Sequence, residues 1–195
     1  IRRREVDFYR DNGYLLVESL LDREVIAELR AVTDGFLERS RRVTRSGALF
    51  DIGAGHGPSR PVVRRIKNPE RQHPVYDRMM RAPRILDVVE ALLGSGVRFH
   101  HGKLNFKPSA GGGAVEWHQD WAFYPHTNDD ILAAGLLLED CGPESGPLMV
   151  VPGSHKGPVY DHHHDGVFVG AMDPLAAGFD PSGAVALTGP IAFVG

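Results

Sequence analysis

The sequence EWHQDW, residues 116–121 of a 195-residue chain, places His118 and Asp120 one residue apart between two tryptophans. Successive side chains of a β-strand point to opposite faces, so residues i and i+2 share a face. If residues 114–120 form a strand, His118 and Asp120 project together and Gln119 projects away from them. An imidazole and a carboxylate on one face supply two ligands of a 2-His-1-carboxylate metal site. The alternative is a polar pair on a surface strand whose tryptophans pack in the core, because His-x-Asp occurs often by chance.

Short strands separated by glycine and proline turns surround this motif. Residues 97–107 alternate in part between apolar and polar side chains, and residues 109–113 read as a glycine-rich turn. This texture is typical of a β-sandwich or β-barrel. Apolar runs predict further strands at residues 131–138, 147–151, 184–187 and 191–194.

The first 95 residues read as mainly helical. Helical periodicity and capping residues predict helices at residues 4–11, 23–41 and 83–94. Short strands are predicted at residues 14–17 and 62–66, and a loop at residues 47–59. We therefore expect one α+β domain over residues 1–195, with a mainly β core from about residue 96 packed against the N-terminal helices.

Composition narrows the class of protein. A net charge of −3, with 42% apolar and 24% charged residues, is ordinary for a globular protein and gives no electrostatic case for nucleic acid or an anionic membrane. Cys141 is the single cysteine, which fits a reducing compartment, so we expect a cytoplasmic location. The chain starts at Ile1 rather than Met and stops on an apolar segment, so we expect that both ends are cut.

The neighbours of EWHQDW carry a resemblance to a known family. They are FYRDNGYLLVESLLDREVIAELR (8–30), KLNFKP (103–108), WHQDWAFYPH (117–126), LLLED (136–140) and GPLMVVPGSHKG (146–157). In this order, over nearly the whole chain, they resemble the phytanoyl-CoA dioxygenase family of Fe(II)- and 2-oxoglutarate-dependent oxygenases. His-x-Asp alone is not specific, whereas its combination with PGSHKG is.

The resemblance implies a fold, a metal and a reaction. The implied fold is a double-stranded β-helix, a cupin-like jelly roll, backed by N-terminal helices. His118 and Asp120 would bind Fe(II). The cosubstrates would be 2-oxoglutarate and O₂, and the reaction would hydroxylate an unactivated C–H bond of a small molecule while 2-oxoglutarate is decarboxylated to succinate and CO₂.

The resemblance also suggests residues for the cosubstrate. Lys103 and Asn105 lie two residues apart on a predicted strand, and in the family this strand contacts 2-oxoglutarate. Arg65 matches a basic cosubstrate contact by position, and His101 would lie beside it. The alternatives are a solvated strand lysine for Lys103 and a satisfied buried histidine for His101.

The substrate would meet residues that follow the metal motif. Trp121, Phe123 and Tyr124 would wall its pocket, although core packing is the alternative for each. Residues 162–164, three successive histidines, read as a loop at the pocket rim that faces solvent; His163 is a substrate-pocket candidate. The alternative is that His162, His163 or His164 reaches the metal as a substitute ligand. We assign no chemistry to His155, which fixes a turn or lines the entrance.

Two further family residues are expected beyond Gly195: a histidine as third ligand and an arginine for the far carboxylate of 2-oxoglutarate. No histidine follows His164 and no arginine follows Arg98. The alternative functions are therefore an inactive cupin-like binding module or an incomplete fragment of such an enzyme. A zinc hydrolase that uses His118 and Asp120 is a third possibility, but the sequence contains no H-E-x-x-H motif.

Overall fold

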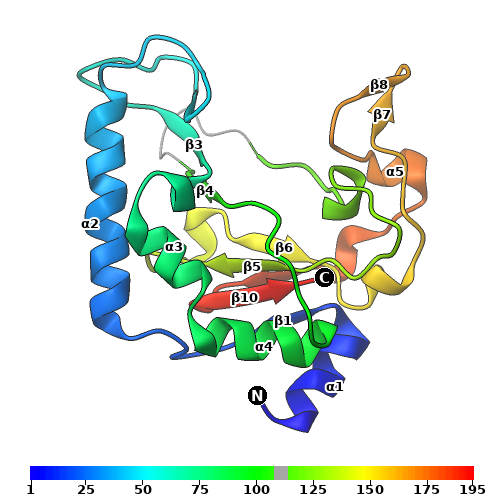
Figure 1. The fold of residues 1–195 in the computed structure, drawn as a ribbon. Helices are drawn as coiled ribbons and strands as arrows, with labels where there is room; N and C mark the ends of the chain where they lie inside the picture. Colours follow the sequence, from blue (N-terminus) through cyan, green and yellow to red (C-terminus); the bar gives the residue numbers. More distant parts are fainter. Residues whose placement is uncertain (108–113) are drawn as a thin grey trace. The chain divides into compact units, whose positions relative to one another are not determined.

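The computed structural model describes residues 1–107 and 114–195, so the glycine-rich turn predicted at residues 109–113 lies outside the described residues. The chain forms two compact units (Figure 1). Unit 1 comprises residues 1–18, 88–95 and 114–195, and unit 2 comprises residues 19–87 and 96–113. Each unit is therefore built from segments that are distant in the sequence.

A three-stranded antiparallel sheet forms the core of unit 1, in the order β1 (Tyr14–Leu16), β10 (Ile191–Val194), β5 (Ala133–Leu136). Strand β10 is apolar along its whole length and pairs on both sides, which explains why Ile191, Ala192 and Phe193 are all buried. Helix α1 (Arg3–Asn12) precedes β1 and ends at Gly13, whose positive φ of 78° suits the left-handed cap of a helix.

Smaller elements complete unit 1. Strand β6 (Leu148–Val150) pairs with β9 (Val185–Leu187), and β7 (His163–His164) pairs with β8 (Val167–Phe168). The turn between β7 and β8 has positive φ at Asp165 (50°) and Gly166 (76°), as a two-residue type I′ hairpin requires. Single turns of 3₁₀ helix lie at Asp120–Ala122, Pro143–Ser145, Ser154–Lys156 and Pro181–Gly183, and α5 spans Pro174–Ala177.

Unit 2 packs helices beside a second antiparallel sheet. Its strands are β2 (Phe50–Ile52), β3 (Val63–Lys67) and β4 (Lys103–Asn105), with β3 in the centre, and a 3₁₀ turn at Pro69–Arg71 follows β3. Helix α2 (Arg23–Ser40) packs on α3 (Pro74–Met80) through the hydroxyls of Thr33 and Tyr76, which contact each other in the buried interface. The fully buried Leu29 and Ile66 anchor a helix and the sheet of this core. Helix α4 (Pro83–Leu93) starts in unit 2 and ends in unit 1.

Most predicted elements are confirmed. The predicted helices correspond to α1, α2 and α4, and the strands predicted at 14–17, 62–66, 131–138, 147–151, 184–187 and 191–194 correspond to β1, β3, β5, β6, β9 and β10. None of the helices in the described residues is long and apolar enough to cross a membrane.

Three predictions of local structure are wrong. The loop predicted at residues 47–59 contains β2, because Phe50 is buried and the strand pairs with β3. Residues 114–119 form no strand, and a 3₁₀ turn begins at Asp120. Residues 162–164 are not a solvent-facing loop, since His162 is buried and the next two residues form β7.

Candidate metal site

The predicted metal pair converges in unit 1, although not on a strand. His118 Nε2 lies 3.6 Å from Asp120 Oδ1, and their side chains are 26% and 34% exposed. The backbone of Gln119 between them is extended (φ −117°, ψ 128°), which keeps the flanking side chains on one side. The 3₁₀ turn that starts at Asp120 then leads the chain away. The predicted juxtaposition therefore rests on one extended residue rather than on a ladder of strand hydrogen bonds.

The arrangement of the pair fits a divalent metal. His118 Nδ1 lies 2.8 Å from the carbonyl oxygen of Glu116, which can only accept a hydrogen bond, so Nδ1 carries the proton. Nε2 is then the nitrogen with the lone pair, and it faces Asp120. Metal-binding histidines commonly donate their other ring N–H to a carbonyl in this way. Two metal–ligand bonds of about 2.1 Å can together span the 3.6 Å between Nε2 and Oδ1.

A third ligand for the predicted site is not found among the described residues. Among residues 1–107 and 114–195, no group of three or more His, Cys, Asp and Glu side chains comes together as a metal site. His162, considered from sequence as a substitute ligand, uses both ring nitrogens in hydrogen bonds: Nδ1 with Tyr160 O (2.8 Å) and Nε2 with the amide of Gln119 (2.9 Å). It is therefore not a ligand in this arrangement, and the histidine expected beyond Gly195 stays a prediction.

An aromatic cluster borders His118. The ring of Phe123 meets that of His118 edge to face at a centroid distance of 5.7 Å, and it meets Phe168 of β8 at 5.2 Å. Tyr124 lies beside Phe123 at 6.1 Å. His163 packs on Phe168 at 5.4 Å, so these pocket candidates belong to one aromatic cluster that contacts His118 through Phe123.

Two other aromatic residues of the motif have structural contacts. Trp121 donates its indole N–H to the carbonyl of Asn128 at 3.1 Å, which ties the 3₁₀ turn to the loop that follows. Trp117 is half-buried and packs edge to face against Phe179 at 5.9 Å, so it does not lie in the buried core. His163 also donates to Asp161 through its ring and its backbone N–H, and these bonds lower the pKa of the Asp161 carboxyl.

The predicted cosubstrate residues lie in unit 2. Lys103 and Asn105 are both exposed on β4, one on each side of the half-buried Leu104, and so share a face. Asn105 pairs with Arg65 of β3, whose guanidinium Nε donates to Asn105 Oδ1 at 3.3 Å. This contact orients the arginine on the exposed face of the sheet.

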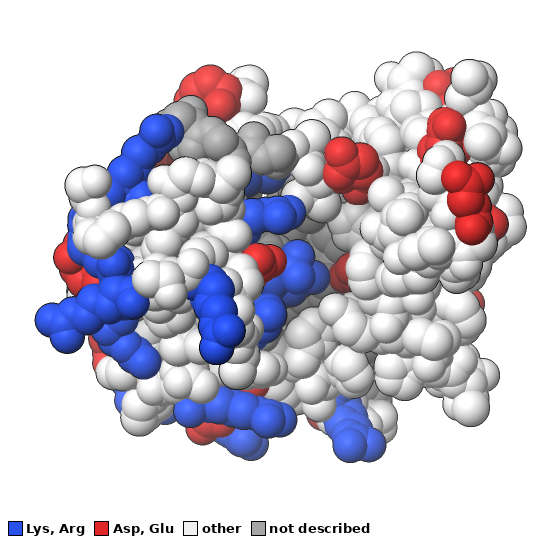
Figure 2. All heavy atoms as spheres, turned by 90° about the horizontal axis from the view of Figure 1, so that it is seen from above, with Lys and Arg blue, Asp and Glu red and all other residues white. Residues whose placement is uncertain are grey.

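The surroundings of these residues are basic. Unit 2 contains 17 Lys and Arg against 9 Asp and Glu. Figure 2 shows basic side chains gathered over the part of the surface that α2 and β3 form. His101, the remaining cosubstrate candidate, is half-buried and its ring contacts that of His100 edge to face, with Nδ1 atoms 2.8 Å apart. The exposed face of β3 and β4 thus suits an anion.

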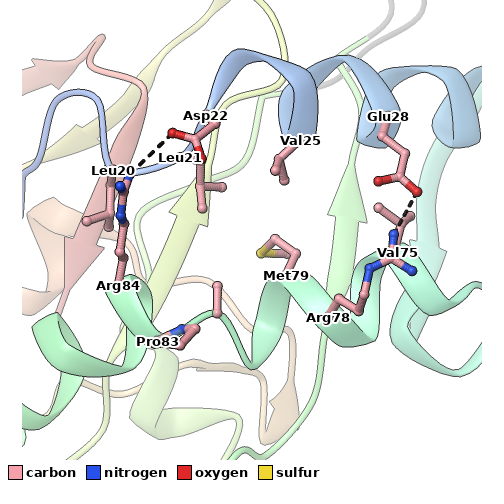
Figure 3. Close-up of a pocket in the computed structure, with 11 residues that line it drawn as sticks. Leu20, Leu21, Asp22, Val25, Glu28, Val75, Arg78, Met79, Pro83 and Arg84 are labelled. Atoms are coloured by element: carbon pink, nitrogen blue, oxygen red, sulfur yellow. Dashed lines mark hydrogen bonds and ion pairs between the residues drawn. The ribbon is translucent and has the colours of Figure 1, made fainter.

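A surface cavity of about 390 Å³ also lies in unit 2, beside the start of α2 (Figure 3). Met79 contributes to its apolar wall. Its charged residues are matched in pairs, with Asp22 3.3 Å from Arg84 and Glu28 2.7 Å from Arg78. None of the predicted site residues lines it, and with its charges paired it suggests no chemistry.

The PGSHK sequence has a structural role that the sequence alone left open. His155 Nε2 donates to the carbonyl of Arg10 at 3.1 Å, and Lys156 Nζ lies 3.4 Å from Asp11. The amide of Gly153 donates to the carbonyl of Asn12 at 2.9 Å. The His155 and Gly153 bonds satisfy carbonyls at the end of α1, where unpaired carbonyls and partial negative charge collect, and Lys156 pairs with the Asp11 carboxylate. The PGSHK segment therefore holds the C-terminal end of α1 within unit 1, and these contacts are called the clasp below.

Antiparallel sheets, together with a loop that brings an imidazole and a carboxylate close to each other, point to the class of metal-binding β-proteins. The comparison with known families assigns the chain within this class: the model of the phytanoyl-CoA dioxygenase family (PhyH) matches residues 9–169, so the chain belongs to this family. This assignment confirms the resemblance seen in the sequence.

Two relatives illustrate the range of the family. Over 190 residues the chain is 35% identical to a probable alpha-ketoglutarate-dependent hypophosphite dioxygenase of Stutzerimonas stutzeri, covering 95% of this chain and 66% of that protein. Over 157 residues it is 32% identical to the ectoine dioxygenase of Bordetella bronchiseptica, covering 78% of this chain and 49% of that protein. The chain thus spans about half of one of these relatives and just under two thirds of the other.

Solved structures confirm the fold class. The structure of EctD from S. alaskensis with bound Fe matches the whole chain and 68% of its own length, with a TM-score of 0.77 and 25% identity. EctD with 2-oxoglutarate and 5-hydroxyectoine matches with a TM-score of 0.76 and 26% identity, over 67% of its length. The predicted cupin-like jelly roll with N-terminal helices is therefore correct.

Proposed function

We propose that this chain belongs to an Fe(II)- and 2-oxoglutarate-dependent dioxygenase that hydroxylates a small molecule. The observation that carries the proposal is the pair His118 Nε2 and Asp120 Oδ1, 3.6 Å apart, with the other histidine nitrogen bonded to Glu116 O. Bound Fe(II), with 2-oxoglutarate and O₂, supplies the oxidising chemistry: one oxygen atom enters the substrate, the other enters succinate, and CO₂ leaves. Relatives named as alpha-ketoglutarate-dependent and ectoine dioxygenases support this reaction.

In this proposal the residues of the chain bind and orient. His118 and Asp120 hold the metal. Arg65 and Lys103 supply positive charge for the carboxylates of 2-oxoglutarate. Asn105 keeps the Arg65 guanidinium oriented, so that little rotational freedom is lost on binding.

The remaining candidates have separate roles within the two units. In unit 2, His101 would contact the cosubstrate. Within unit 1, Phe123 and Tyr124 would form an aromatic wall beside His118, with His163 at its exposed edge, and Trp121 supports this wall from the 3₁₀ turn.

The substrate is a small molecule, and the relatives suggest which compounds to test first. Hypophosphite is the substrate named for the 35% identical relative, and ectoine for the 32% identical one. The basic balance of unit 2 suits an anionic substrate as well as 2-oxoglutarate. We further propose a cytoplasmic location, based on the single cysteine, and no nucleic-acid or membrane partner, based on the net charge of −3.

The test is anaerobic addition of Fe(II) and 2-oxoglutarate to the full-length protein. We expect the weak visible charge-transfer band of 2-oxoglutarate on iron, lost in His118→Ala and retained in His164→Ala. His164 is a suitable control because its side chain is 82% exposed. With O₂ and the correct substrate, succinate should form in equal amount to hydroxylated product.

Two results would count against the proposal. A band of equal strength in His118→Ala would remove this pair from the site. Binding of metal and 2-oxoglutarate without succinate, for any substrate tested, would identify the protein as a binding module instead.

A further inference from the structure

His162 is a buried histidine that the proposed reaction does not use. It is the first of three successive histidines and is only 2% exposed, whereas the side chains of His163 and His164 are 50% and 82% exposed. A buried imidazole costs free energy unless its polar atoms have partners. The burial of His162 beside two exposed histidines therefore indicates that its ring has specific polar partners.

Both ring nitrogens of His162 have defined partners. Nδ1 lies 2.8 Å from the carbonyl oxygen of Tyr160, which accepts, so Nδ1 carries the proton. Nε2 lies 2.9 Å from the backbone nitrogen of Gln119, which donates, so Nε2 is the acceptor. One neutral tautomer satisfies both bonds. The second bond reaches the residue that separates His118 from Asp120.

The backbone of His162 is anchored as well. Its carbonyl accepts from the amides of Val169 (3.0 Å) and Gly170 (3.3 Å), which follow the β7–β8 hairpin. The ring therefore extends from a point held by the end of the hairpin. A ring held in this way transmits the position of the hairpin to the amide of Gln119.

The side chain of Gln119 makes a second connection to the same region. Its amide nitrogen donates to Pro158 O at 3.0 Å, and its oxygen accepts from the amide of Tyr160 at 2.8 Å. Gln119 is thus held at its backbone nitrogen by His162 and at both polar atoms of its side chain by residues 158–160. Rotation of the Gln119 backbone is the motion that would separate the side chains of His118 and Asp120.

We propose that His162 is a positioning residue of the metal site. Its ring holds the amide of Gln119 and, with the side-chain bonds of Gln119, keeps that residue extended so that His118 and Asp120 converge. This inference rests on the proposed function for the presence of a metal. The clamp, defined as His162, Gln119 and the carbonyls of Pro158 and Tyr160, is a property of unit 1 itself.

Simple core packing is the competing account, and a matched set of variants separates the two. His162→Leu fills a similar volume but leaves the Gln119 amide and the Tyr160 carbonyl without their partner. His162→Gln retains one N–H donor and one acceptor. His164→Leu is the control, because it makes the same chemical change at an exposed neighbour.

The measurement is anaerobic titration of each full-length variant with Co(II), a spectroscopic substitute for Fe(II), followed by its visible ligand-field spectrum. We expect His162→Leu to weaken metal binding by about 10- to 100-fold, as loss of a partner that orients a metal ligand does. His162→Gln should recover most of the affinity and the parent spectrum, and His164→Leu should match the parent. Parent-like affinity and spectrum in His162→Leu would overturn the proposal, as would equal losses in His162→Leu and His162→Gln.

A second measurement does not depend on any variant folding. Histidine side-chain ¹⁵N spectra of the metal-free protein should show His162 as the neutral Nδ1–H tautomer with its proton protected from exchange. An Nε2–H tautomer at His162 would contradict the clamp. If the parent protein binds no Co(II) while the Nδ1–H tautomer is present, the proposed function fails and the clamp remains a structural feature without a metal to position.

Discussion

Histidine rings in unit 1 share a local bond that fixes their orientation. His118 and His162 each donate Nδ1–H to the carbonyl two residues earlier, Glu116 O and Tyr160 O, at 2.8 Å. The bond is short-range in sequence, so it forms wherever the intervening backbone turns suitably. It directs Nε2 of His118 toward Asp120 and Nε2 of His162 toward Gln119. The same ring geometry thus serves a proposed ligand in one case and a positioning contact in the other.

Tyr9 provides a residue-scale prediction about pH. Burial raises the pKa of the Tyr9 phenol to about 12. Because the folded-state pKa is above the ordinary value of 10.0, the stability linked to this group is fully present below pH 10 and is lost as the pH rises toward 12. Titration followed by tyrosinate absorbance should show late-titrating tyrosines in the parent, and Tyr9→Phe should reduce the amplitude of this late change by one group. Tyr76 is also expected to titrate late, since burial raises its pKa too, so one late phase should remain. A Tyr9→Phe profile identical to that of the parent would contradict the assignment.

At the scale of elements, the clasp at the end of α1 joins regions more than 140 positions apart in sequence. Gly13 has a φ of 78°, and a Cβ added there would overlap the His155 ring. The glycine is therefore needed for two reasons, its left-handed backbone and the close approach of His155. The sequence signal Asn12-Gly13 predicted the end of the helix, but not the residue that packs over it.

A double-mutant cycle tests the clasp. Gly13→Ala should cost about 1–2 kcal/mol from backbone strain and about 1 kcal/mol more from displacing the His155 hydrogen bond. In a His155→Ala background only the strain should remain, which gives a coupling of about 1 kcal/mol. Gly178→Ala is the matched control, with φ 66° and nothing within 4 Å of an added Cβ. Denaturant midpoints give the free energy of unfolding of the parent, the two single variants, the double variant and the Gly178→Ala control. Additive effects of Gly13→Ala and His155→Ala would show that the two residues do not interact.

At the scale of the whole molecule, charge is divided unevenly between the units. Unit 1 has 5 Lys and Arg against 16 Asp and Glu, whereas unit 2 has 17 against 9. The net charge of −3 hides this division. The proposed cation site lies in the acidic unit, and the proposed anion contacts lie in the basic one. Each unit thus has the charge balance that favours its own proposed ligand.

This division predicts how 2-oxoglutarate binding responds to salt. The affinity of the Fe(II)-loaded or Co(II)-loaded protein for 2-oxoglutarate should fall as ionic strength rises, because exposed charges are screened. Arg65→Gln should weaken binding about tenfold or more, since a hydrogen bond to a charged group contributes roughly 1.5–3 kcal/mol. Arg23→Gln, an exposed arginine on α2, should change it little. Calorimetric titration measures both, and equal effects of the two substitutions would remove Arg65 from the cosubstrate site.

The sequence by itself determined most helices and strands, since hydrophobic periodicity and the Gly and Pro signals act over a few residues. Its motifs also identified the family and the pair His118 and Asp120. One local signal is Asp165-Gly166, which is typical of a hairpin turn and lies between β7 and β8, although a loop was predicted at residues 162–164. Local sequence signals did not predict the structure of residues 114–120, where a strand was expected but a 3₁₀ turn begins at Asp120.

Only the tertiary structure decided which of three identical side chains is buried. Nothing in HHH distinguishes His162 from His163 and His164, because the difference lies in partners more than 40 residues away in the chain, at Gln119. The same holds for His155 on Arg10 and for Asn105 on Arg65. Hydrogen bonds between distant segments depend on register and packing, which a local pattern cannot specify. The sequence therefore named the proposed ligand pair, and the fold determined what holds that pair together.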